Sequence, residues 1–349
     1  MNPVSLHVVV EHGEDRQPYG CAYIRDILPL THPVNQGSFR VTHGLGLREA
    51  EIVVVERTWK PAVTLGEAED LVARVRRQGS CLVYSLDDNL LDLEGLPQET
   101  RAVVRLFCRE ADGVVVATPA LAERVGGLSR CVRLVPNAVD ERLHFSGEED
   151  PPQQREGRLV VGYMGTFTHD RDLMMVLQPL REILRQWPGP VELQIVGALA
   201  DRKLMLAFEG LPATLIQVPG QDVAYPRFVP WMHRNLRWDV AVAPLEDTAF
   251  NRYKSDIKYL DYAALGCPGI YSSVPSYTGT VEHLRTGLLV DEAPASWAAA
   301  LAALLGDPGL RRRLAAAAAA EVRSRRSLAA CGGSWSDAIL AIAAGRGTP

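Results

Sequence analysis

Short apolar runs separated by stretches of helical length fill the first 145 residues. These runs are rich in valine, isoleucine and leucine without polar alternation, which is typical of strands buried on both faces. They lie at residues 5–10, 52–55, 81–86, 113–117 and 134–135. Two helix starts are marked between them, because Thr64 and Glu67 form a capping-box pattern and Thr118 precedes Pro119. The alternation predicts an α/β domain around a parallel sheet.

The pattern stops at residue 145 and resumes after a polar, acidic stretch. That stretch contains Pro151 and Pro152 and continues neither a helix nor a central strand, so it predicts an interdomain linker at residues 146–157. Further strand-like runs lie at residues 159–163, 191–196, 215–218, 240–243, 269–272 and 288–290. The sequence therefore predicts two Rossmann-like, doubly wound domains that face a central cleft. Their predicted bounds are 1–145 and 158–330, and residues 331–349 are predicted as a carboxyl-terminal helix that packs back on the first domain.

Composition and charge narrow the classes of partner. The net charge of -5 comes from interleaved acidic and basic residues, which argues against nucleic-acid binding. The cysteines lie far apart, without a cysteine or histidine at zinc-ligand spacing, so we expect reduced thiols and no metal site. The amino terminus lacks a signal-peptide pattern, and the apolar window at residues 297–305 is shorter than the roughly 20 residues that span a bilayer. We expect a cytoplasmic protein with at most peripheral membrane contact.

The lysines single out one segment. Only four of the 37 cationic residues are lysines, and Lys254 and Lys258 are one helical turn apart. With Asp261 they have the spacing i, i+4, i+7, which predicts one stripe of a helix. Two ammonium groups on one stripe repel each other unless an anion lies between them, and a diphosphate satisfies both. Asp261 would then accept hydrogen bonds from ribose hydroxyls. The alternative is a solvated helix face with a weak Lys258–Asp261 pair.

A second candidate is a strand-to-helix turn with two glycines. Gly162 and Gly165 precede His169 and Arg171, and a helical stretch follows. Glycines let backbone amides approach an anion, and the helix amino terminus adds a favourable dipole. A tight turn that needs glycine for its shape explains the same residues.

Two segments of the first domain complete the candidates. Asp87 and Asp88 follow an apolar run, where carboxylates suit the orientation of an acceptor hydroxyl, a general base or a divalent cation. A turn or helix cap explains them equally well. Tyr19, Gly20 and Arg25 follow the first run and form either a wall of the acceptor site or ordinary packing.

Four segments together resemble the GT-B glycosyltransferases, and within them the bacterial family 4 type. Residues 134–140 are similar to the Pro-Asn-Gly-Val-Asp motif that ends the first domain of this family. Residues 260–268 are similar to its Leu-Glu-Ala-Met-Ala-x-Gly-x-Pro motif, residues 287–290 match its Gly-Leu-Leu-Val motif, and residues 87–89 recur in a subgroup. The resemblance implies transfer of a sugar, with retention, from a nucleotide diphosphate sugar to an acceptor hydroxyl. The acceptor would be a glycan, a lipid-linked glycan or a small molecule.

The resemblance also distributes roles. Protein cations and helix-terminal amides would stabilise the leaving diphosphate, so no cofactor or metal is required. The expected catalytic residues are Asp87, Asp88, Arg171 and Lys258; the donor-binding residues are Gly165, Thr166, Lys254, Ser255 and Asp261; and the acceptor-side residues are Tyr19, Gly20 and Arg25.

The sequence departs from the family at two positions. Tyr253 stands where the first glutamate of the family's Glu-x7-Glu pair falls, and Thr166 stands where an arginine is usual. Glu246, Asp247 and Asn251 are the candidates to replace the missing carboxylate.

Three other functions fit part of the pattern. A non-catalytic relative that binds a nucleotide sugar or serves as a partner subunit would explain the missing glutamate, and an epimerase would act on the nucleotide sugar itself. A nicotinamide dehydrogenase is disfavoured, because no Gly-x-Gly-x-x-Gly follows the first apolar run.

Overall fold

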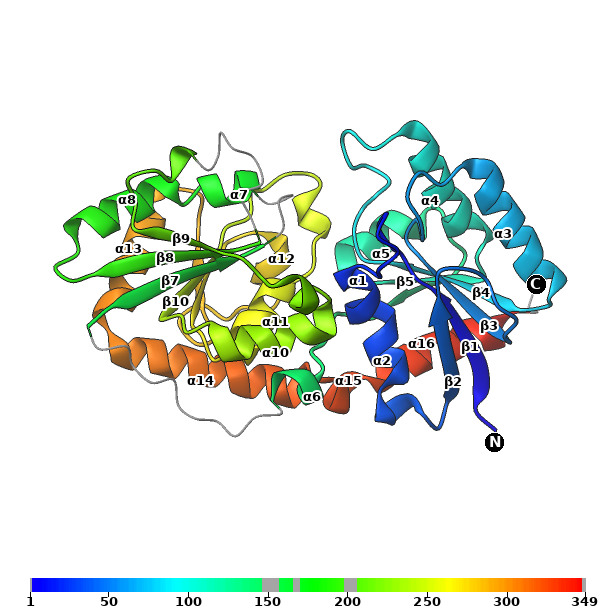
Figure 1. The fold of residues 1–349 in the computed structure, drawn as a ribbon. Helices are drawn as coiled ribbons and strands as arrows, with labels where there is room; N and C mark the ends of the chain where they lie inside the picture. The colour runs from blue at the N-terminus through cyan, green and yellow to red at the C-terminus, as the bar shows by residue number, and fades with distance from the viewer. Residues whose placement is uncertain (1, 146–156, 166–169, 198–205, 347–349) are drawn as a thin grey trace. The chain divides into compact units, whose positions relative to one another are not determined.

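A computed structural model describes residues 2–145, 157–165, 170–197 and 206–346. The chain forms two compact units, each around its own parallel sheet (Figure 1). Unit 1 contains residues 1–140, 253–255 and 326–349, and unit 2 contains residues 141–252 and 256–325. The chain therefore passes from unit 1 to unit 2 after Asp140, five residues before the predicted end of the first domain, and the predicted linker falls almost wholly outside the described residues.

Unit 1 is built on a six-stranded sheet in the order β2-β1-β3-β4-β5-β6, with every pairing parallel. The strands are β1 (Val4–Val9), β2 (Phe39–Gly44), β3 (Ile52–Glu56), β4 (Cys81–Leu86), β5 (Gly113–Val116) and β6 (Val132–Leu134). The helices are α1 (Gly20–Ala22), the π-helix η1 (Tyr23–Ile27), α2 (Leu28–Thr31), η2 (Pro33–Asn35), α3 (Leu65–Arg77), α4 (Gln98–Glu110), α5 (Pro119–Gly126), α15 (Leu328–Cys331) and α16 (Gly333–Gly345).

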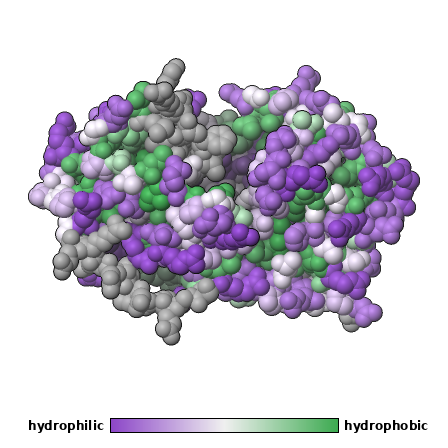
Figure 2. Space-filling view, in the orientation of Figure 1, coloured by the Kyte–Doolittle hydropathy of each residue, from purple (hydrophilic) through white to green (hydrophobic). Residues whose placement is uncertain are grey.

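The four inner strands of unit 1, β1, β3, β4 and β5, bury both faces, as their unbroken apolar runs predicted, whereas the edge strands β2 and β6 are largely exposed. In β4, Leu82 and Tyr84 pack into one core with helices α3 and α4, whereas Cys81 and Val83 pack into the core on the opposite face. The outer residues of α3 are charged, and hydrophilic residues cover the visible surface around it (Figure 2). Alternate side chains of each strand thus join two separate cores.

The carboxyl-terminal segment belongs to unit 1. One stretch, Leu328–Gly345, is long and apolar enough to cross a membrane by length and composition alone. In the structure it is divided into α15 and α16, and Trp335, Ile339 and Ile342 pack into the core of unit 1. The apolar side chains on one side of this stretch therefore contribute to the core of unit 1.

Unit 2 has a second six-stranded parallel sheet in the order β12-β11-β10-β7-β8-β9. Its strands are β7 (Leu159–Met164), β8 (Val191–Val196), β9 (Ala213–Ile216), β10 (Val240–Ala243), β11 (Gly269–Ser272) and β12 (Leu288–Val290). Its helices are α6 (Glu141–His144), α7 (Asp170–Met174), α8 (Leu177–Gln186), η4 (Gly220–Asp222), α10 (Tyr225–Asn235), η5 (Asn251–Tyr253), which extends into unit 1, α11 (Ile257–Ala264), α12 (Pro275–Thr278), α13 (Pro294–Gly306) and α14 (Pro308–Arg325).

Strand order shows where each unit offers a binding edge. In unit 1 the chain runs outward from β1 to β2 and then returns to place β3 on the other side of β1. In unit 2 it runs outward through β7, β8 and β9 and returns to place β10 beside β7. Ligands of open α/β sheets bind beyond the carboxyl ends of the strands at such reversals. The loops after β1 and β3, and those after β7 and β10, are therefore the places to look for a site.

Candidate functional site

At the reversal in unit 2, a buried aspartate joins the two loops. Asp172 of α7, which follows β7, is 5% exposed. Its Oδ1 accepts a hydrogen bond of 3.0 Å from the backbone N–H of Glu246, which follows β10. The side-chain amide of Asn251 lies 3.4 Å from the same oxygen. This aspartate was not singled out in the sequence analysis, although it directly follows the predicted site residue Arg171.

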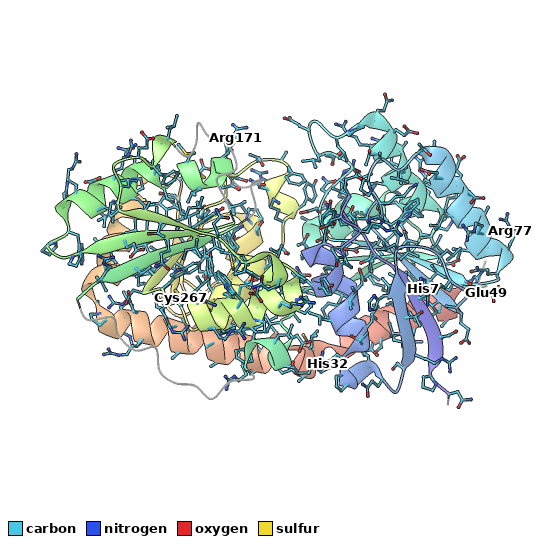
Figure 3. All side chains as sticks on the ribbon, in the orientation of Figure 1. His7, His32, Glu49, Arg77, Arg171 and Cys267 are labelled. Atoms are coloured by element: carbon cyan, nitrogen blue, oxygen red, sulfur yellow. The ribbon has the colours of Figure 1, made fainter. Side chains whose placement is uncertain are left out.

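The turn after β7 brings two backbones close together. A Cβ added to Gly165 would lie 2.7 Å from the Tyr163 hydroxyl, and one added to Gly197 would lie 2.6 Å from the Gly165 carbonyl oxygen. A side chain at Gly197 would therefore collide with the Gly165 backbone, and one at Gly165 would collide with Tyr163. Arg171 is exposed at the start of α7 (Figure 3). Thr166 and His169 lie outside the described residues.

Helix α11 carries two buried charged side chains. Lys258 is 8% exposed and Asp261 is 7% exposed, and the two residues lie on adjacent turns of the helix. Burial raises the pKa of Asp261 to about 7, although the Lys258 ammonium and the Tyr225 side chain oppose this. Because α11 begins at Ile257, Lys258 lies in its first turn. The pair is thus buried, which argues against the solvated helix face.

The predicted three-residue stripe is wrong at Lys254. Asp256 occupies the N-cap position of α11, so Lys254 precedes the helix. Lys254 belongs with Tyr253 and Ser255 to unit 1. The hydroxyl of Thr118 donates to the Tyr253 carbonyl at 3.0 Å, and this contact holds the segment from the unit 1 side.

Unit 1 also binds the other two residues of this short segment. The side-chain amide of Asn137 donates to the Ser255 hydroxyl at 2.9 Å. Lys254 Nζ lies 3.9 Å from Asp88 Oδ1. Lys254, a predicted donor-binding residue, therefore lies beside the predicted catalytic carboxylate Asp88 of unit 1, whereas Lys258 belongs to unit 2.

At the reversal in unit 1, one arginine gathers three carboxylates. Arg57, directly after β3, lies 2.8 Å from Glu11, 2.8 Å from Asp87 and 3.2 Å from Asp88. Its φ of 45° is a left-handed backbone conformation that is costly for a residue with a side chain. Asp87 and Glu11 raise the pKa of Arg57 well above its ordinary value in spite of burial. Arg57 and Glu11 were not singled out in the sequence because neither lies in a motif.

Two more carboxyl groups are buried beneath this cluster. Burial raises the pKa of Asp26 to about 7, and burial, Asp26 and Glu11 raise the pKa of Glu56 well above its ordinary value. Asp26 is 3% exposed and Glu56 is 1% exposed. Buried carboxyl groups with raised pKa values hold protons near neutral pH.

The predicted acceptor-side residues differ in their exposure to solvent. Tyr19 is 48% exposed, and Gly20 is exposed at the start of α1. Arg25, in contrast, is 1% exposed, and the same guanidinium nitrogen donates to the Val135 carbonyl and to the Asn137 side chain. Its guanidinium also lies over the Trp335 ring at 5.5 Å. The structure therefore gives Arg25 the packing role that was its alternative, in place of contact with an acceptor.

The three candidates for the missing carboxylate differ in what they bind. Asp247 makes two hydrogen bonds with Arg252, of 2.7 and 3.0 Å. Asn251 is 9% exposed, and its amide donates to the Glu246 carbonyl at 3.0 Å. Glu246 is held at both its N–H and its carbonyl, whereas its partly exposed carboxylate has no hydrogen bond or ion pair within the described part of the chain. Only Glu246 of the three thus offers a fixed backbone and an open carboxylate.

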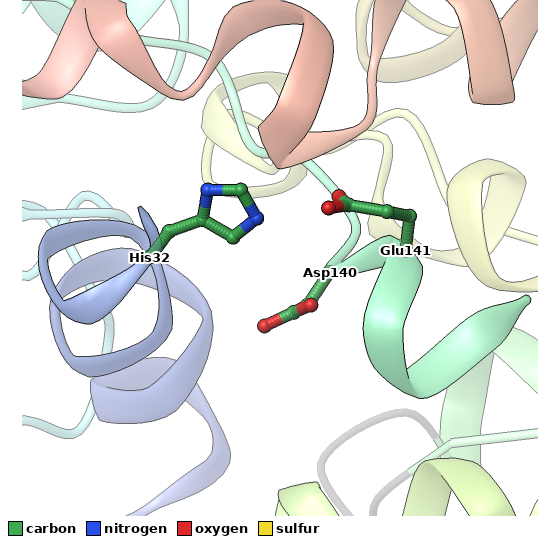
Figure 4. Close-up of side chains that lie close together, drawn as sticks. All are labelled: His32, Asp140 and Glu141. Carbon is green, nitrogen blue, oxygen red and sulfur yellow. The ribbon is translucent and has the colours of Figure 1, made fainter. Parts of the chain in front are cut away.

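A separate polar pair lies away from these edges. His32 and Asp140 of unit 1 are buried, and each offers a ligand atom within 4.8 Å of the other (Figure 4). Both also take part in other polar interactions. Both side chains are thus engaged within the protein, and we assign no metal to them.

A match to a known protein family falls within unit 2. Residues 158–307 match the family model described as Glycosyl transferases group 1. No curated protein matches the sequence. The match covers most of unit 2. This part of the chain contains the buried Lys258–Asp261 pair and the hydrogen bond from the Glu246 N–H to Asp172.

Solved structures resemble most of the chain, over 84–97% of its residues in three cases. Anabaena HepE in complex with UDP and glucose is 13% identical, with a TM-score of 0.68 over 97% of this chain and 100% of that one. Sucrose-phosphate synthase from Thermosynechococcus elongatus is 18% identical, with a TM-score of 0.57 over 84% and 74% of the two chains. The pneumococcal O-GlcNAc transferase GtfA, in complex with UDP and GlcNAc, is 12% identical, with a TM-score of 0.59 over 85% and 57%. The chain therefore has the GT-B fold of nucleotide-sugar-dependent glycosyltransferases, and its residues 158–307 carry the sequence pattern of the glycosyl transferases group 1.

Proposed function

We propose that this protein transfers a sugar, with retention, from a nucleotide diphosphate sugar to an acceptor hydroxyl. The observation that carries the proposal is the Lys258–Asp261 pair, buried in α11 within the matched residues. Unit 2 would bind the donor. Lys258 offers a compact charge to the leaving diphosphate, and Asp261 offers a carboxylate to the ribose. The related structures with UDP bound support a nucleotide donor.

Departure of the diphosphate would be assisted by cations at the carboxyl edge of unit 2. Negative charge develops on the leaving oxygen, and a fixed ammonium group in a water-poor site stabilises it more than it stabilises the ground state. Lys258 is held by burial, whereas Arg171 is exposed at the start of α7 and is free to close on the phosphates. This role needs no metal ion, so we propose that none is required.

The sugar of the donor would be recognised by Glu246. A carboxylate accepts hydrogen bonds from two sugar hydroxyls, and a backbone fixed at both ends fixes the direction of the side chain. Glu246 has this backbone, because its N–H donates to Asp172 and its carbonyl accepts from Asn251. We propose that it replaces the carboxylate lost at Tyr253.

The acceptor would bind at the carboxylate cluster of unit 1. Asp87 and Asp88 lie beside the Arg57 guanidinium, and Lys254 is near Asp88. Ionised carboxylates accept hydrogen bonds from a hydroxyl and orient it for attack. Tyr19 and Gly20 would add an exposed wall on the same side of the unit. We also propose that the reaction takes place in the cytoplasm, where nucleotide sugars would be available to it.

The test is a donor-turnover assay with UDP-sugars and water as the default acceptor. We expect release of UDP and free sugar, and a loss of about 100-fold or more in turnover for Lys258→Ala, because such contacts contribute roughly 3 kcal/mol. Lys60→Ala is the matched control, since Lys60 pairs with Glu67 at the surface of unit 1. Unchanged turnover in Lys258→Ala would refute the assignment. Donor binding without turnover would indicate the non-catalytic relative, and conversion to another nucleotide sugar would indicate the epimerase.

A further inference from the structure

Three side chains of unit 2 form a buried line that the sequence analysis did not identify. His144 lies on α6, His233 on α10 and Asp261 on α11. His233 Nε2 lies 3.2 Å from His144 Nδ1, and His144 Nε2 lies 3.9 Å from Asp261 Oδ1. The residues are far apart in sequence, and the packing of α6 against α10 brings them together.

Both atoms of the longer contact are sealed from solvent. The His144 side chain is 0% exposed and the Asp261 side chain is 10% exposed. Within the described residues, neither His144 Nε2 nor Asp261 Oδ1 has a hydrogen-bond partner. Buried polar atoms without partners are rare, and each is costly. At 3.9 Å the two atoms are about 1 Å beyond a normal hydrogen bond, a gap of the size that often closes when a ligand orders a site.

The hydrogen bond between the histidines determines which ring nitrogen of His144 carries its proton. Burial, with His233 beside it, lowers the pKa of His144 to about 3, and burial, with Arg237, lowers the pKa of His233 to about 4. Both rings are therefore neutral at pH 7, with one N–H each. If His233 Nε2 donates to His144 Nδ1, the single proton of His144 must be on Nε2, where it points at a carboxylate oxygen. The opposite arrangement would place a bare nitrogen against that oxygen.

We propose that His144 is a positioning residue for Asp261: His233 fixes its tautomer, and its Nε2–H holds Asp261 Oδ1 so that the rest of the carboxylate faces the nucleotide ribose. This inference rests on the proposed donor site. It resembles the way in which a second group fixes the tautomer and direction of a histidine in metal and hydrolase sites. A neutral donor suits this position because it supports the ionised carboxylate without adding a charge next to Lys258.

The experiment measures binding of three ligands by calorimetry. UDP carries both ribose hydroxyls, 2′,3′-dideoxy-UDP lacks them, and pyrophosphate lacks the nucleoside. We expect His144→Leu to weaken UDP about tenfold, which corresponds to about 1.4 kcal/mol. The same variant should change the Kd of pyrophosphate and of the dideoxy nucleotide by less than about twofold. His144→Gln keeps an N–H donor at the position of Nε2 and should restore most of the UDP affinity.

Controls separate positioning from folding and from failure of the donor site itself. His43→Leu alters an exposed histidine of β2 in unit 1 and should leave all three affinities unchanged. In the double variant of His144→Leu with Asp261→Ala, the histidine change should cost nothing further. Equal losses for all three ligands, or unchanged UDP binding in His144→Leu, would overturn the inference. If the wild type binds neither UDP nor pyrophosphate, the proposed donor site has failed as well.

Discussion

Replacing Asp261 with asparagine should make unit 2 more stable at neutral pH, and by an amount that grows with pH. Burial raises the pKa of Asp261 from 3.8 to about 7 in the folded protein. The folded state therefore binds this proton more tightly than the unfolded state, and stability falls as the pH rises from about 4 to about 7. Each pKa unit corresponds to 1.36 kcal/mol, so a shift of about 3 units sets an upper limit of about 4 kcal/mol.

The neighbouring histidines change the pH dependence of stability in the opposite direction, so their contribution must be subtracted. The pKa values of His144 and His233 are lowered, so the unfolded state takes up their protons first as the pH falls below about 6.5. Stability from this source rises with pH over the same window. In the pH dependence of wild-type stability, the contributions of Asp261 and of the two histidines therefore partly cancel. The difference between Asp261→Asn and wild type removes the histidine contribution, because both proteins retain both rings.

The assay is native-state hydrogen exchange of the α11 and β10 amides at pH 5, 6, 7 and 8 and fixed ionic strength, which reports unit 2 separately. The stability difference should favour Asp261→Asn by about 1.6 kcal/mol at pH 5, which lies about one unit above the unfolded pKa of 3.8, and by up to about 4 kcal/mol at pH 8. Asp247→Asn is the control, since Asp247 is exposed and its pKa is lowered by Arg252. A difference that does not change with pH would refute the view that Asp261 is held in a site that disfavours its charge.

Three further outcomes follow from the same geometry. Glu246→Gln should reduce kcat/KM for the nucleotide sugar at least tenfold while the Kd of UDP stays within about twofold, whereas Asp247→Asn should alter neither, as measured by turnover and calorimetry. Turnover should survive excess EDTA unchanged, and its loss would assign a metal to the reaction. Arg57→Leu should lower the unfolding free energy of unit 1 by about 3 kcal/mol in urea titrations, because it leaves Glu11 and its neighbours without their cation; no loss of stability would show that the cluster does not depend on Arg57.

The sequence predicted the fold well where burial is two-sided. The run at residues 81–86 has no polar alternation because β4 packs on two cores, and such runs are legible in a single sequence. Strand β2 was missed because it is an edge strand, pairing only with β1 and carrying Arg40, Thr42 and His43. One-sided burial leaves no continuous apolar run to find.

The sequence predicted the parts of the site that lie on one helix, because these depend on the spacing of neighbouring residues. Lys258 and Asp261 lie on one helix, and their spacing is visible in the sequence. Lys254 was misplaced because the helix begins at Ile257, and its contact with Asp88 depends on a segment that packs into unit 1. The hydrogen bond from the Glu246 N–H to Asp172 joins two loops that are far apart in sequence. The reversal of strand order brings these loops together.

The central claim is that α11 of unit 2 holds a nucleoside diphosphate through Lys258 and Asp261. Calorimetric titration of UDP, GDP, dTDP and ADP into wild type, Lys258→Ala and Asp261→Ala tests it most directly. We predict that one nucleotide binds selectively to the wild type and that each substitution weakens it by about tenfold or more. Binding that is equally tight in all three proteins, or no binding of any nucleotide with or without magnesium, would contradict the claim.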